Sequence, residues 1–591
     1  MTASAHDEDE AEKSYDGKLL RRFLGYVRPH WRPTAATLTV TLVHIAAGLA
    51  APFIVREALD GPVAAGDADG LLGWTALFFA MVVADGVLET AGHYLSNLAG
   101  QRIIYDLRAA VFAHLQKMPV TFYDRNPVGR LLTRVTGDVE NLAELFTSGL
   151  VGMLSSVLLL VAAAAGMLWL DVRLTLVSLS VLPLLWAATA LFRKHARKTY
   201  SASRKAIAAV TAYLNESLGG LKTIQSFSRE ALCVSRFGAR NDEHLARSLD
   251  SAFVYSFFWP GIECVSTLAT ALILWYGGGE ILRGTLSFGT FLAFWHLLRK
   301  FFEPIQELAE KYNILQAAMA SSERLFKLLD TAPAVAAPAR PVRPSRRGAV
   351  EFRGVSHSYD GVTPVLTDLS FKVEPGEKVA IVGYTGAGKT TILSLLLRLY
   401  DAQAGSVLVD GVDVREQDPI ELRRRFGMVF QDVFLFSGTV RDNLKLGVDA
   451  SPENLERAAR LAHADRVIAR LPQGWDTPVQ ERGAALSVGE RQLLSFARAL
   501  ASDPPILVLD EATSSVDAET EGLIQDAVES MLEGRTAIVV AHRLATVRKA
   551  DRILVMHHGR LREVGSHDQL VAQGGLYDKL VKLQWSGVAT L

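Results

Sequence analysis

One glycine-rich stretch has the residue types and spacing of a phosphate-binding loop. The apolar run Val379 to Val382 ends in V-G-Y-T-G-A-G-K-T-T, residues 382–391. Glycines leave backbone N–H groups bare, and a helix that begins just after them turns its positive end toward the same place. The residues predicted to hold nucleotide phosphates are Gly383, Tyr384, Thr385, Gly386, Ala387, Gly388, Lys389, Thr390 and Thr391.

Two side chains of this loop have separate predicted roles. The Lys389 ammonium would reach the outer phosphates, and the Thr390 hydroxyl would hold Mg²⁺. A plain glycine-rich turn between a strand and a helix is the alternative. All fixed positions of the pattern are filled between an apolar run and a helical pattern, which favours nucleotide binding.

A second candidate lies one domain's length further on, in P-P-I-L-V-L-D-E, Pro504 to Glu511. Phosphoryl transfer to water needs a positioned Mg²⁺ and an oriented water molecule more than it needs covalent chemistry. Asp510 is predicted at the metal and Glu511 beside the attacking water. An acidic strand-to-loop turn is the alternative, and the phosphate loop upstream disfavours it.

The composition indicates a membrane protein. Of the 591 residues, 49% are apolar, and the mean hydropathy is +0.19, where a soluble enzyme of this size is usually more polar. The net charge of -1 gives no electrostatic case for nucleic acid as a partner. The two cysteines, Cys233 and Cys264, cannot form a disulfide framework and have no metal-ligand spacing.

The first half of the chain is predicted to be a transmembrane domain, residues 19–330, behind a disordered acidic tail, residues 1–18. Residues 19–31 mix Arg with aromatics, as a helix in the headgroup region would. Six apolar stretches have the length of a membrane-spanning helix. They are 34–55, 71–94, 145–170, 174–192, 255–275 and 288–307. The loops after the second and fourth are long and basic, so both chain ends and these two loops are predicted in the cytosol.

Those two loops are rich in helix formers, which predicts that the transmembrane helices project below the membrane. Pro119, Pro127 and Gly129 indicate a tight reversal in the first loop, and the stretch Asn215 to Phe227 is the candidate reversal in the second. Each reversal is a place where another domain could be contacted.

Ionisable residues inside spans are candidates for function. Asp85 and Glu89 lie one helical turn apart in the second span, and Glu263 lies in the fifth; His44 and His296 are weaker cases. They could form a substrate cavity that prefers cations. Equally, they could face a hydrated vestibule or snorkel toward an interface.

Residues 331–348 form a Pro- and Arg-rich linker. In residues 349–591, short β-branched apolar runs alternate with helical patterns, which predicts an α/β nucleotide-binding domain with a mainly parallel sheet. The predicted fold class is therefore a membrane α-helical domain with long cytosolic extensions, followed by an α/β P-loop ATPase domain.

From about Leu19 to its end the chain resembles the ATP-binding cassette family, specifically exporter half-transporters with the membrane domain first. The most specific mark is L-S-V-G-E-R-Q, residues 486–492, which is similar to the family signature. Four further motifs occur in the family's order. They are H-S-Y-D-G with Tyr359, V-F-Q-D with Gln431, S-S-V-D at 514–517, and A-I-V-V-A-H with His542.

The resemblance implies a helical subdomain in the cassette and a role for each matching residue. Tyr359 would stack on adenine, Gln431 would bind Mg²⁺ and sense it, and His542 would contact the γ-phosphate. Ser487 and Gly489 would face the γ-phosphate of ATP held by a second cassette. The sequence departs from the family pattern at Val488, where Gly is usual, and at Glu490, where Gln is usual.

A half-transporter implies a dimer with two ATP molecules between the cassettes, and a homodimer is slightly favoured over a heterodimer. The implied activity is export, or flipping between leaflets, of amphiphilic drugs or lipids across a plasma or inner membrane, driven by ATP hydrolysis. A nucleotide-gated channel or regulatory membrane protein is the alternative, and Glu511 argues against it. A soluble cassette protein would lack the spans.

Overall fold

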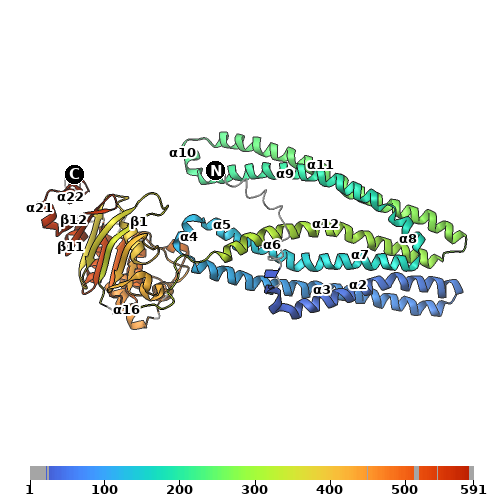
Figure 1. Cartoon of the computed structure of the whole chain (residues 1–591), viewed down its shortest axis with the longest axis horizontal. Coiled ribbons are helices and arrows are strands. Elements are labelled where there is room, and N and C mark those ends of the chain that lie inside the picture. The colour runs from blue at the N-terminus through green and yellow to red at the C-terminus, as the bar shows by residue number, and fades with distance from the viewer. Residues whose placement is uncertain are drawn as a thin grey trace. The chain divides into compact units, whose positions relative to one another are not determined.

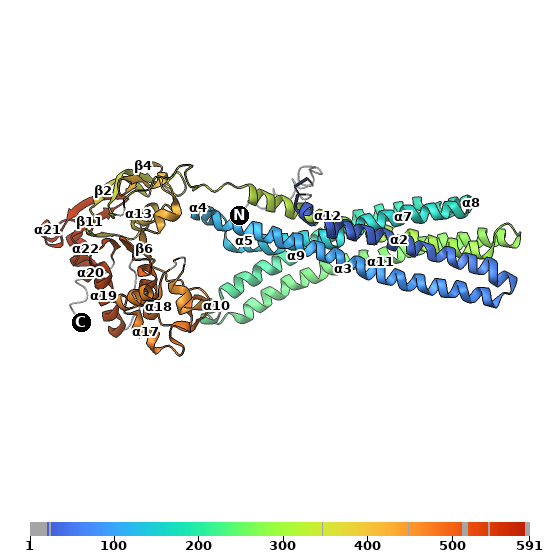
Figure 2. The ribbon, with the colours of Figure 1, turned by 90° about the horizontal axis from the view of Figure 1, so that it is seen from below.

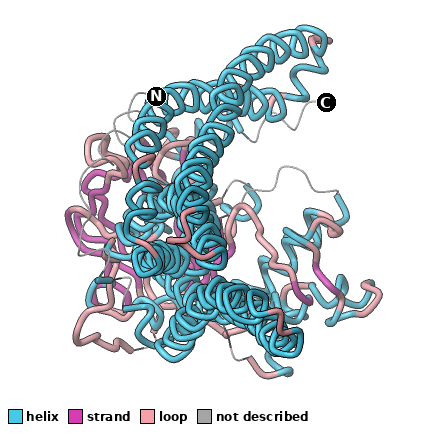
Figure 3. The backbone as a smooth tube through the Cα atoms, turned by 90° about the vertical axis from the view of Figure 1, so that its right-hand side faces the viewer, coloured by secondary structure: helices cyan, strands magenta, loops and turns pink. Residues whose placement is uncertain are grey.

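The computed structural model describes residues 21–22, 25–345, 347–446, 448, 450–510, 518–541 and 544–584. The chain divides into two compact units. The first holds the described residues up to His114 and Gly129–Thr331; the second holds Leu115–Val128 and the described residues from Ala332 onward. Every described strand belongs to the second unit. Figure 3 draws the strands in magenta and the helices in cyan.

The first unit consists of long helices that lie side by side along one direction (Figure 1). The longest are α3 (Ala68–Lys117), α9 (Leu182–Gly219), α11 (Glu230–Leu282) and α12 (Phe288–Asp330). The others are the helices α2 (Trp31–Ala58), α5 (Val128–Thr133), α6 (Val139–Glu144), α7 (Leu150–Leu170), α8 (Val172–Leu179) and α10 (Leu221–Ser226). Helices α9 and α11 form an antiparallel pair joined by α10, which both side views show (Figure 2).

Five helical segments of this unit are long and apolar enough to cross a membrane: Gly25–Val63, Ala68–Lys117, Val128–Leu170, Val172–Gly219 and Glu230–Leu282. Large apolar side chains remain exposed on them, among them Phe79, Trp186 and Trp275, at 70%, 76% and 79%. An apolar surface of this kind suits contact with lipid. Helix α12 does not meet the same criterion, because Arg299, Lys300 and Glu303 interrupt its apolar stretch. The sixth span, 288–307, stays a prediction.

Both predicted reversals contain a short helix. The first is α4 (Val120–Arg125), which follows Pro119 and whose C-cap residue is Asn126. The second is α10, which lies in the predicted stretch 215–227 and begins directly after Gly220. Helix α4 clusters with the second unit, whereas α10 belongs to the first.

The second unit is built on two sheets. The six-stranded sheet has the order β12-β11-β3-β10-β9-β6, in which only β12 runs antiparallel to its neighbour. Its strands are β3 (Lys378–Gly383), β6 (Phe426–Val429), β9 (Ile506–Asp510), β10 (Thr536–Val540), β11 (Arg552–His557) and β12 (Arg560–Gly565). The predicted mainly parallel sheet is therefore confirmed.

The other large sheet is antiparallel, with the order β2-β1-β4-β5. Its strands are β1 (Val350–His357), β2 (Leu366–Val373), β4 (Ala404–Val409) and β5 (Val412–Asp413). A two-stranded sheet pairs β7 (Gly438–Thr439) with β8 (Pro478–Val479). Helices complete the unit: α13 (Lys389–Leu396), α14 (Pro419–Arg423), α15 (Val440–Leu444), α16 (Pro452–Leu461), α17 (Ala464–Arg470), α18 (Val488–Leu500), α19 (Ala518–Leu532), α20 (Leu544–Arg548), α21 (His567–Ala572) and α22 (Leu576–Gln584).

The central strand β3 is buried on both faces, which explains its unbroken apolar sequence. Val379 and Ile381 pack into the core that includes the antiparallel sheet and α13. Ala380 and Val382 pack into a second core, which includes residues of α16 to α19. The phosphate loop therefore follows a strand that is buried between two cores.

A buried ion pair joins the linker to the cassette. Asp410, 1% exposed at its side chain, pairs with Arg425 at 2.8 Å. Its Oδ1 also accepts hydrogen bonds from the backbone N–H groups of Gly348 and Ala349, at 2.7 and 2.8 Å. Arg425 in turn donates to the carbonyl of Pro344 at 2.7 Å. One carboxylate thus fixes the chain just before β1.

We expect Asp410→Ala to lower the free energy of unfolding of the cassette by about 3–5 kcal/mol, because Arg425 would stay buried without its partner. The loss of stability is measured by thermal unfolding of the full-length protein in detergent, with proteolysis of the cassette as the readout of its unfolding. The control is Glu351→Ala, which removes the more exposed ion pair with Arg353 and should change stability by at most about 1 kcal/mol. Equal losses in the two variants would contradict the role given to Asp410.

Candidate nucleotide-binding site

The phosphate loop joins the end of β3 to the start of α13, as the sequence predicts. Gly386 and Gly388 have positive φ angles of 81° and 94°. A Cβ atom on Gly388 would lie 2.7 Å from Leu366 Cδ2, and one on Gly383 would lie 2.4 Å from the carbonyl oxygen of Met556. The loop approaches β11 at Gly383 and β2 at Gly388 so closely that a side chain at either position would not fit. This packing favours glycine at both positions whether or not a ligand is bound.

The Lys389 side chain is folded into this loop. Its Nζ donates to the carbonyl oxygens of Gly383, at 2.6 Å, and Tyr384, at 3.2 Å. Lys389 is 7% exposed. Burial lowers the pKa of its ammonium, and the carboxylate of Asp510 opposes that effect. A buried ammonium at the start of a helix favours an anion such as a phosphate.

The residues predicted around the metal lie at one edge of the parallel sheet. Asp510 ends β9 and is 6% exposed, and Thr390 Oγ1 lies 3.4 Å from its Oδ2. Gln431 follows β6, which pairs with β9, so it leaves the same edge and is exposed. Hydroxyl, carboxylate and amide oxygens are the ligands that suit Mg²⁺, which takes few protein ligands and keeps phosphates and water. These residue types fit the group.

The aromatic predicted to stack on adenine lies beside the loop. The hydroxyl of Tyr359 is 3.1 Å from Thr391 Oγ1. The Tyr359 ring packs edge-on against Tyr400, with centroids 5.1 Å apart. Tyr359 remains 44% exposed, so part of its ring is accessible. Tyr384 of the loop is 41% exposed.

The signature segment forms the start of α18. Ser487 is its N-cap: the Ser487 hydroxyl accepts from the N–H of Glu490 at 3.2 Å, and Glu490 Oε2 accepts from the N–H of Ser487 at 2.8 Å. Glu490 therefore has a structural role, because its side chain completes the reciprocal cap of α18. This role was not predicted from the sequence. Gly489 is buried and Val488 is 45% exposed. Within the described residues, no hydrogen bond or ion pair joins Ser487 or Gly489 to the phosphate loop of the same chain.

Glu511, His542 and the S-S-V-D motif at 514–517 lie outside the described residues, although the strands that lead to Glu511 and His542 are described. β9 ends at Asp510 directly before Glu511, and β10 ends at Val540, two residues before His542. In the register of these strands, Val540 pairs with Asp510 and with Ile381. Both strands therefore end at the edge of the sheet that carries the phosphate loop.

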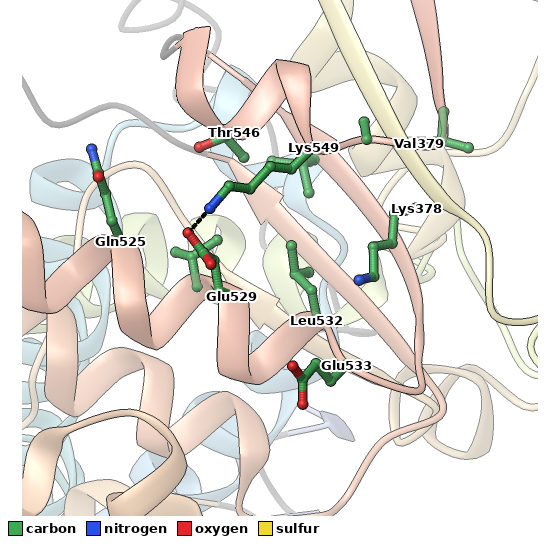
Figure 4. Close-up of a pocket in the computed structure, with 11 residues that line it drawn as sticks. Lys378, Val379, Gln525, Glu529, Leu532, Glu533, Thr546 and Lys549 are labelled. Carbon is green, nitrogen blue, oxygen red and sulfur yellow. Dashed lines mark hydrogen bonds and ion pairs between the residues drawn. The ribbon is translucent and has the colours of Figure 1, made fainter. Parts of the chain in front are cut away.

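A separate hollow of about 140 Å³ lies between α19 and α20 (Figure 4). Lys549 and Glu529 form an ion pair beside it. None of its eleven lining residues belongs to the phosphate loop, the strand end at Asp510 or the signature segment. The predicted residues, and not this hollow, form the candidate site.

The sequence predicted that the first reversal could contact another domain, but it did not identify the residues that make the contact of α4. Tyr400 donates a hydrogen bond to Asp124 of α4 at 2.6 Å, within the compact unit that includes both. Burial and this hydrogen bond raise the pKa of the Tyr400 hydroxyl, so it keeps its proton. Tyr400 also touches Tyr359, and Tyr359 touches Thr391. A continuous chain of contacts therefore connects α4 with the helix that starts at Lys389.

In the first unit, Asp85 lies near two basic residues, His44 and Lys300. Its Oδ1 lies 3.0 Å from His44 Nδ1. A Cβ atom on Gly48 would be 3.1 Å from both Asp85 Oδ1 and Lys300 Nζ, so these groups converge on one point of α2. Glu89, Glu263 and His296 are exposed in the single chain. These contacts weaken the case for Asp85 as a site for cationic substrates.

We expect Lys389→Met to remove the stabilisation of the cassette by a non-hydrolysable ATP analogue. At 100 times its dissociation constant the nucleotide should stabilise the wild-type cassette by about 2.7 kcal/mol. Thermal unfolding with and without nucleotide measures this. The matched control is Lys378→Met at the other end of β3, which should keep the full shift. A nucleotide-dependent shift of wild-type size in Lys389→Met would contradict the site.

Known proteins resemble this chain over nearly all of its length. The profile described as "ABC transporter transmembrane region" matches residues 35–305, and the one described as "ABC transporter" matches residues 366–514. The uncharacterized ABC transporter ATP-binding protein YknV of Bacillus subtilis is 37% identical over 97% of this chain and 96% of its own length. An ATP-dependent lipid A-core flippase of Syntrophus aciditrophicus is 34% identical over 96% and 94%. The structure of a bacterial Atm1-family ABC exporter with ATP bound superposes with a TM-score of 0.78, at 29% identity, over 95% of this chain and 98% of that one.

Proposed function

The chain belongs to the ABC transporter family as an ATP-driven exporter half-transporter, and we propose that it moves amphiphilic compounds or lipids across a plasma or inner membrane by alternating access. The observation that carries this is the loop of residues 383–391, with Lys389 buried in it and Asp510 at the same sheet edge. One relative is named as a lipid flippase, which supports a lipid-like substrate.

We propose specific roles for the candidate residues at bound ATP and Mg²⁺. The loop N–H groups and Lys389 hold the phosphates, and Tyr359 stacks on the adenine. Thr390, Asp510 and Gln431 hold Mg²⁺, which supplies charge neutralisation for phosphoryl transfer. Glu511 orients and deprotonates the attacking water, and His542 donates to the γ-phosphate.

A half-transporter acts as a dimer, and we propose that its partner is a second copy of this chain. The residues of the site are present in full, so two copies would form two competent sites. Ser487 and the N–H of Gly489 begin α18, where helix-end donors favour an anion. They would contact the γ-phosphate held by the other cassette, so that ATP joins the two cassettes and hydrolysis releases them.

Helix α4 is the proposed transmitter between ATP and the membrane helices. It follows α3, an apolar helix of membrane-spanning length, and Asp124 within it accepts the Tyr400 hydrogen bond. Since Tyr400 touches the aromatic that would stack on adenine, ATP binding has a short route to α4. Nucleotide that binds the closed state more tightly can then shift the membrane helices. In the proposed topology the chain crosses the membrane six times. Both chain ends and the reversals at α4 and α10 would then face the cytosol.

Glu511→Gln should reduce steady-state ATPase activity by about 100-fold or more while leaving ATP binding intact, because a general base contributes that much. Phosphate release from the purified protein in nanodiscs measures it. The control is the exposed Glu533→Gln, outside the proposed site. Near-normal turnover in Glu511→Gln would contradict the assignment of the base.

Tyr400→Phe should uncouple the two activities. It keeps the aromatic contact with Tyr359 and loses only the hydrogen bond to Asp124, so basal ATPase activity should stay within about twofold while transport per ATP falls several-fold. The control is Tyr577→Phe, which removes another hydrogen bond of the cassette, the one to His567 at 2.7 Å. An unchanged ratio of transport to hydrolysis in Tyr400→Phe would contradict the role of α4.

A further inference from the structure

The loop that connects β1 with β2 carries Tyr359 and is closed by one carboxylate, that of Asp360. Oδ1 of Asp360 accepts hydrogen bonds from the backbone N–H groups of Val362 and Thr363, at 2.8 and 2.7 Å. The same oxygen accepts a hydrogen bond from the Ser358 hydroxyl at 2.8 Å, and Oδ2 accepts one from the Thr363 hydroxyl at 2.9 Å. Asp360 therefore binds the chain both before and after itself and joins the two sides of the loop.

Ser358, the residue before Tyr359, is also held from the side of the sheet. It is 8% exposed, and its carbonyl oxygen accepts a hydrogen bond from Gln403 Nε2 at 2.9 Å. Gln403 directly precedes β4, and its N–H donates to the carbonyl oxygen of Ser356 at 3.1 Å. Both chain neighbours of Tyr359 are thus fixed, Ser358 by the sheet and Asp360 by the loop. This fixes the point and the direction from which the Tyr359 side chain leaves the backbone.

The ring of Tyr359 is supported from the cassette and still accessible. Its hydroxyl lies 3.1 Å from Thr391 Oγ1. The rings of His357 and Tyr400 lie nearly perpendicular to it, with centroids 5.0 and 5.1 Å away. A tyrosine side chain turns about only two χ angles, so its orientation is largely set once its backbone is fixed. The loop therefore decides how the accessible part of the ring is presented.

The carboxylate that closes the loop stays ionised near neutral pH. Hydrogen bonds from the backbone N–H groups of Thr363 and Val362 lower the pKa of Asp360 well below its ordinary value. The Asp360 side chain is exposed, so its charge is hydrated and its contribution to the loop is that of an acceptor. The carbonyl oxygen of an amide could accept the three hydrogen bonds that Oδ1 now accepts.

We propose that Asp360 is a positioning residue for the base of ATP: it orders the loop so that the Tyr359 ring is oriented for stacking before the nucleotide arrives. This role rests on the proposed function, in which Tyr359 stacks on adenine. A loop that is ordered in advance loses less entropy when the ligand binds. Loss of the carboxylate should therefore weaken the contact with the base and spare the contacts with the phosphates.

The test compares two ligands of the full-length protein in nanodiscs, a non-hydrolysable ATP analogue and inorganic tripolyphosphate, each with Mg²⁺. Asp360→Ala should weaken binding of the analogue by about 5- to 10-fold, which is part of what stacking on a base contributes. Tripolyphosphate has no base, so it should bind Asp360→Ala within about twofold of wild type. In steady-state ATPase assays the KM for ATP should rise by the same factor as the analogue's dissociation constant, with kcat within about twofold.

The matched control is Asp418→Ala. The Asp418 carboxylate also accepts two backbone hydrogen bonds, from the N–H groups of Ile420 and Glu421 at the start of α14. Because Asp418 is no part of the proposed site, its loss should leave the affinity for both ligands within about twofold of wild type. An equal effect of Asp418→Ala and Asp360→Ala on the analogue would overturn the role of Asp360.

Two further variants show whether Asp360 acts through the ring. Asp360→Asn keeps an acceptor oxygen and should bind the analogue within about threefold of wild type. Tyr359→Ala should weaken binding of the analogue by about 10- to 100-fold. Adding Asp360→Ala to Tyr359→Ala should then cost less than about a further twofold, because the two residues act as one unit.

Three results would overturn the positioning role while leaving the proposed function in place. They are an unchanged affinity of Asp360→Ala for the analogue, an equal loss of affinity for the analogue and for tripolyphosphate, and a loss that multiplies with that of Tyr359→Ala. An equal loss in Asp360→Asn and Asp360→Ala would also contradict a role through hydrogen bonds. Wild-type affinity of Tyr359→Ala for the analogue would instead refute the adenine contact in the proposed function itself.

Discussion

The phosphate loop is fixed by a steric constraint on its own backbone. Gly383 and Gly388 lie where a Cβ atom would collide with Met556 and Leu366, so the loop is pressed against two strands before any ligand is considered. Since β3 is central in a sheet buried on both faces, the loop inherits the rigidity of the core. A preorganised loop loses little entropy on binding phosphate, and the Lys389 ammonium is held in place by two carbonyl groups.

The rest of the cassette is arranged around that fixed point. Parallel strands deliver Asp510 and Gln431 to the same edge, because their carboxyl ends align. The antiparallel sheet carries Tyr359 beyond the end of β1, and Tyr400 connects Tyr359 to α4 through Asp124. Nucleotide binding at the loop can therefore influence the position of α4, whose residue Asp124 is 276 positions from Tyr400 in sequence. ATP can shift the conformation of the dimer only if it binds one of the two states of the dimer more tightly than the other.

Sequence reasoning predicted the parts that rest on local patterns. The loop, the apolar strands and the helical first half follow from glycine spacing, buried runs and hydropathy, and the structure agrees with them. The antiparallel sheet was not predicted, because β1 and β2 mix charged residues with apolar ones, and β1 also pairs with β4, which follows α13 in the chain. The Tyr400 contact with Asp124 had no local signal. The sequence showed Glu490 only as a departure from the family pattern, and the structure adds that its side chain completes a helix cap.

The central claim is that ATP brings two cassettes together and that its hydrolysis lets them separate. A spin label at Leu583→Cys, an exposed position near the end of α22, in a Cys233→Ser, Cys264→Ser background, reports the distance between the cassettes of a homodimer. Pulsed electron-spin resonance in nanodiscs should give a shorter, narrower distance distribution with a non-hydrolysable ATP analogue than with ADP or without nucleotide. The same distribution in all three conditions would contradict the account.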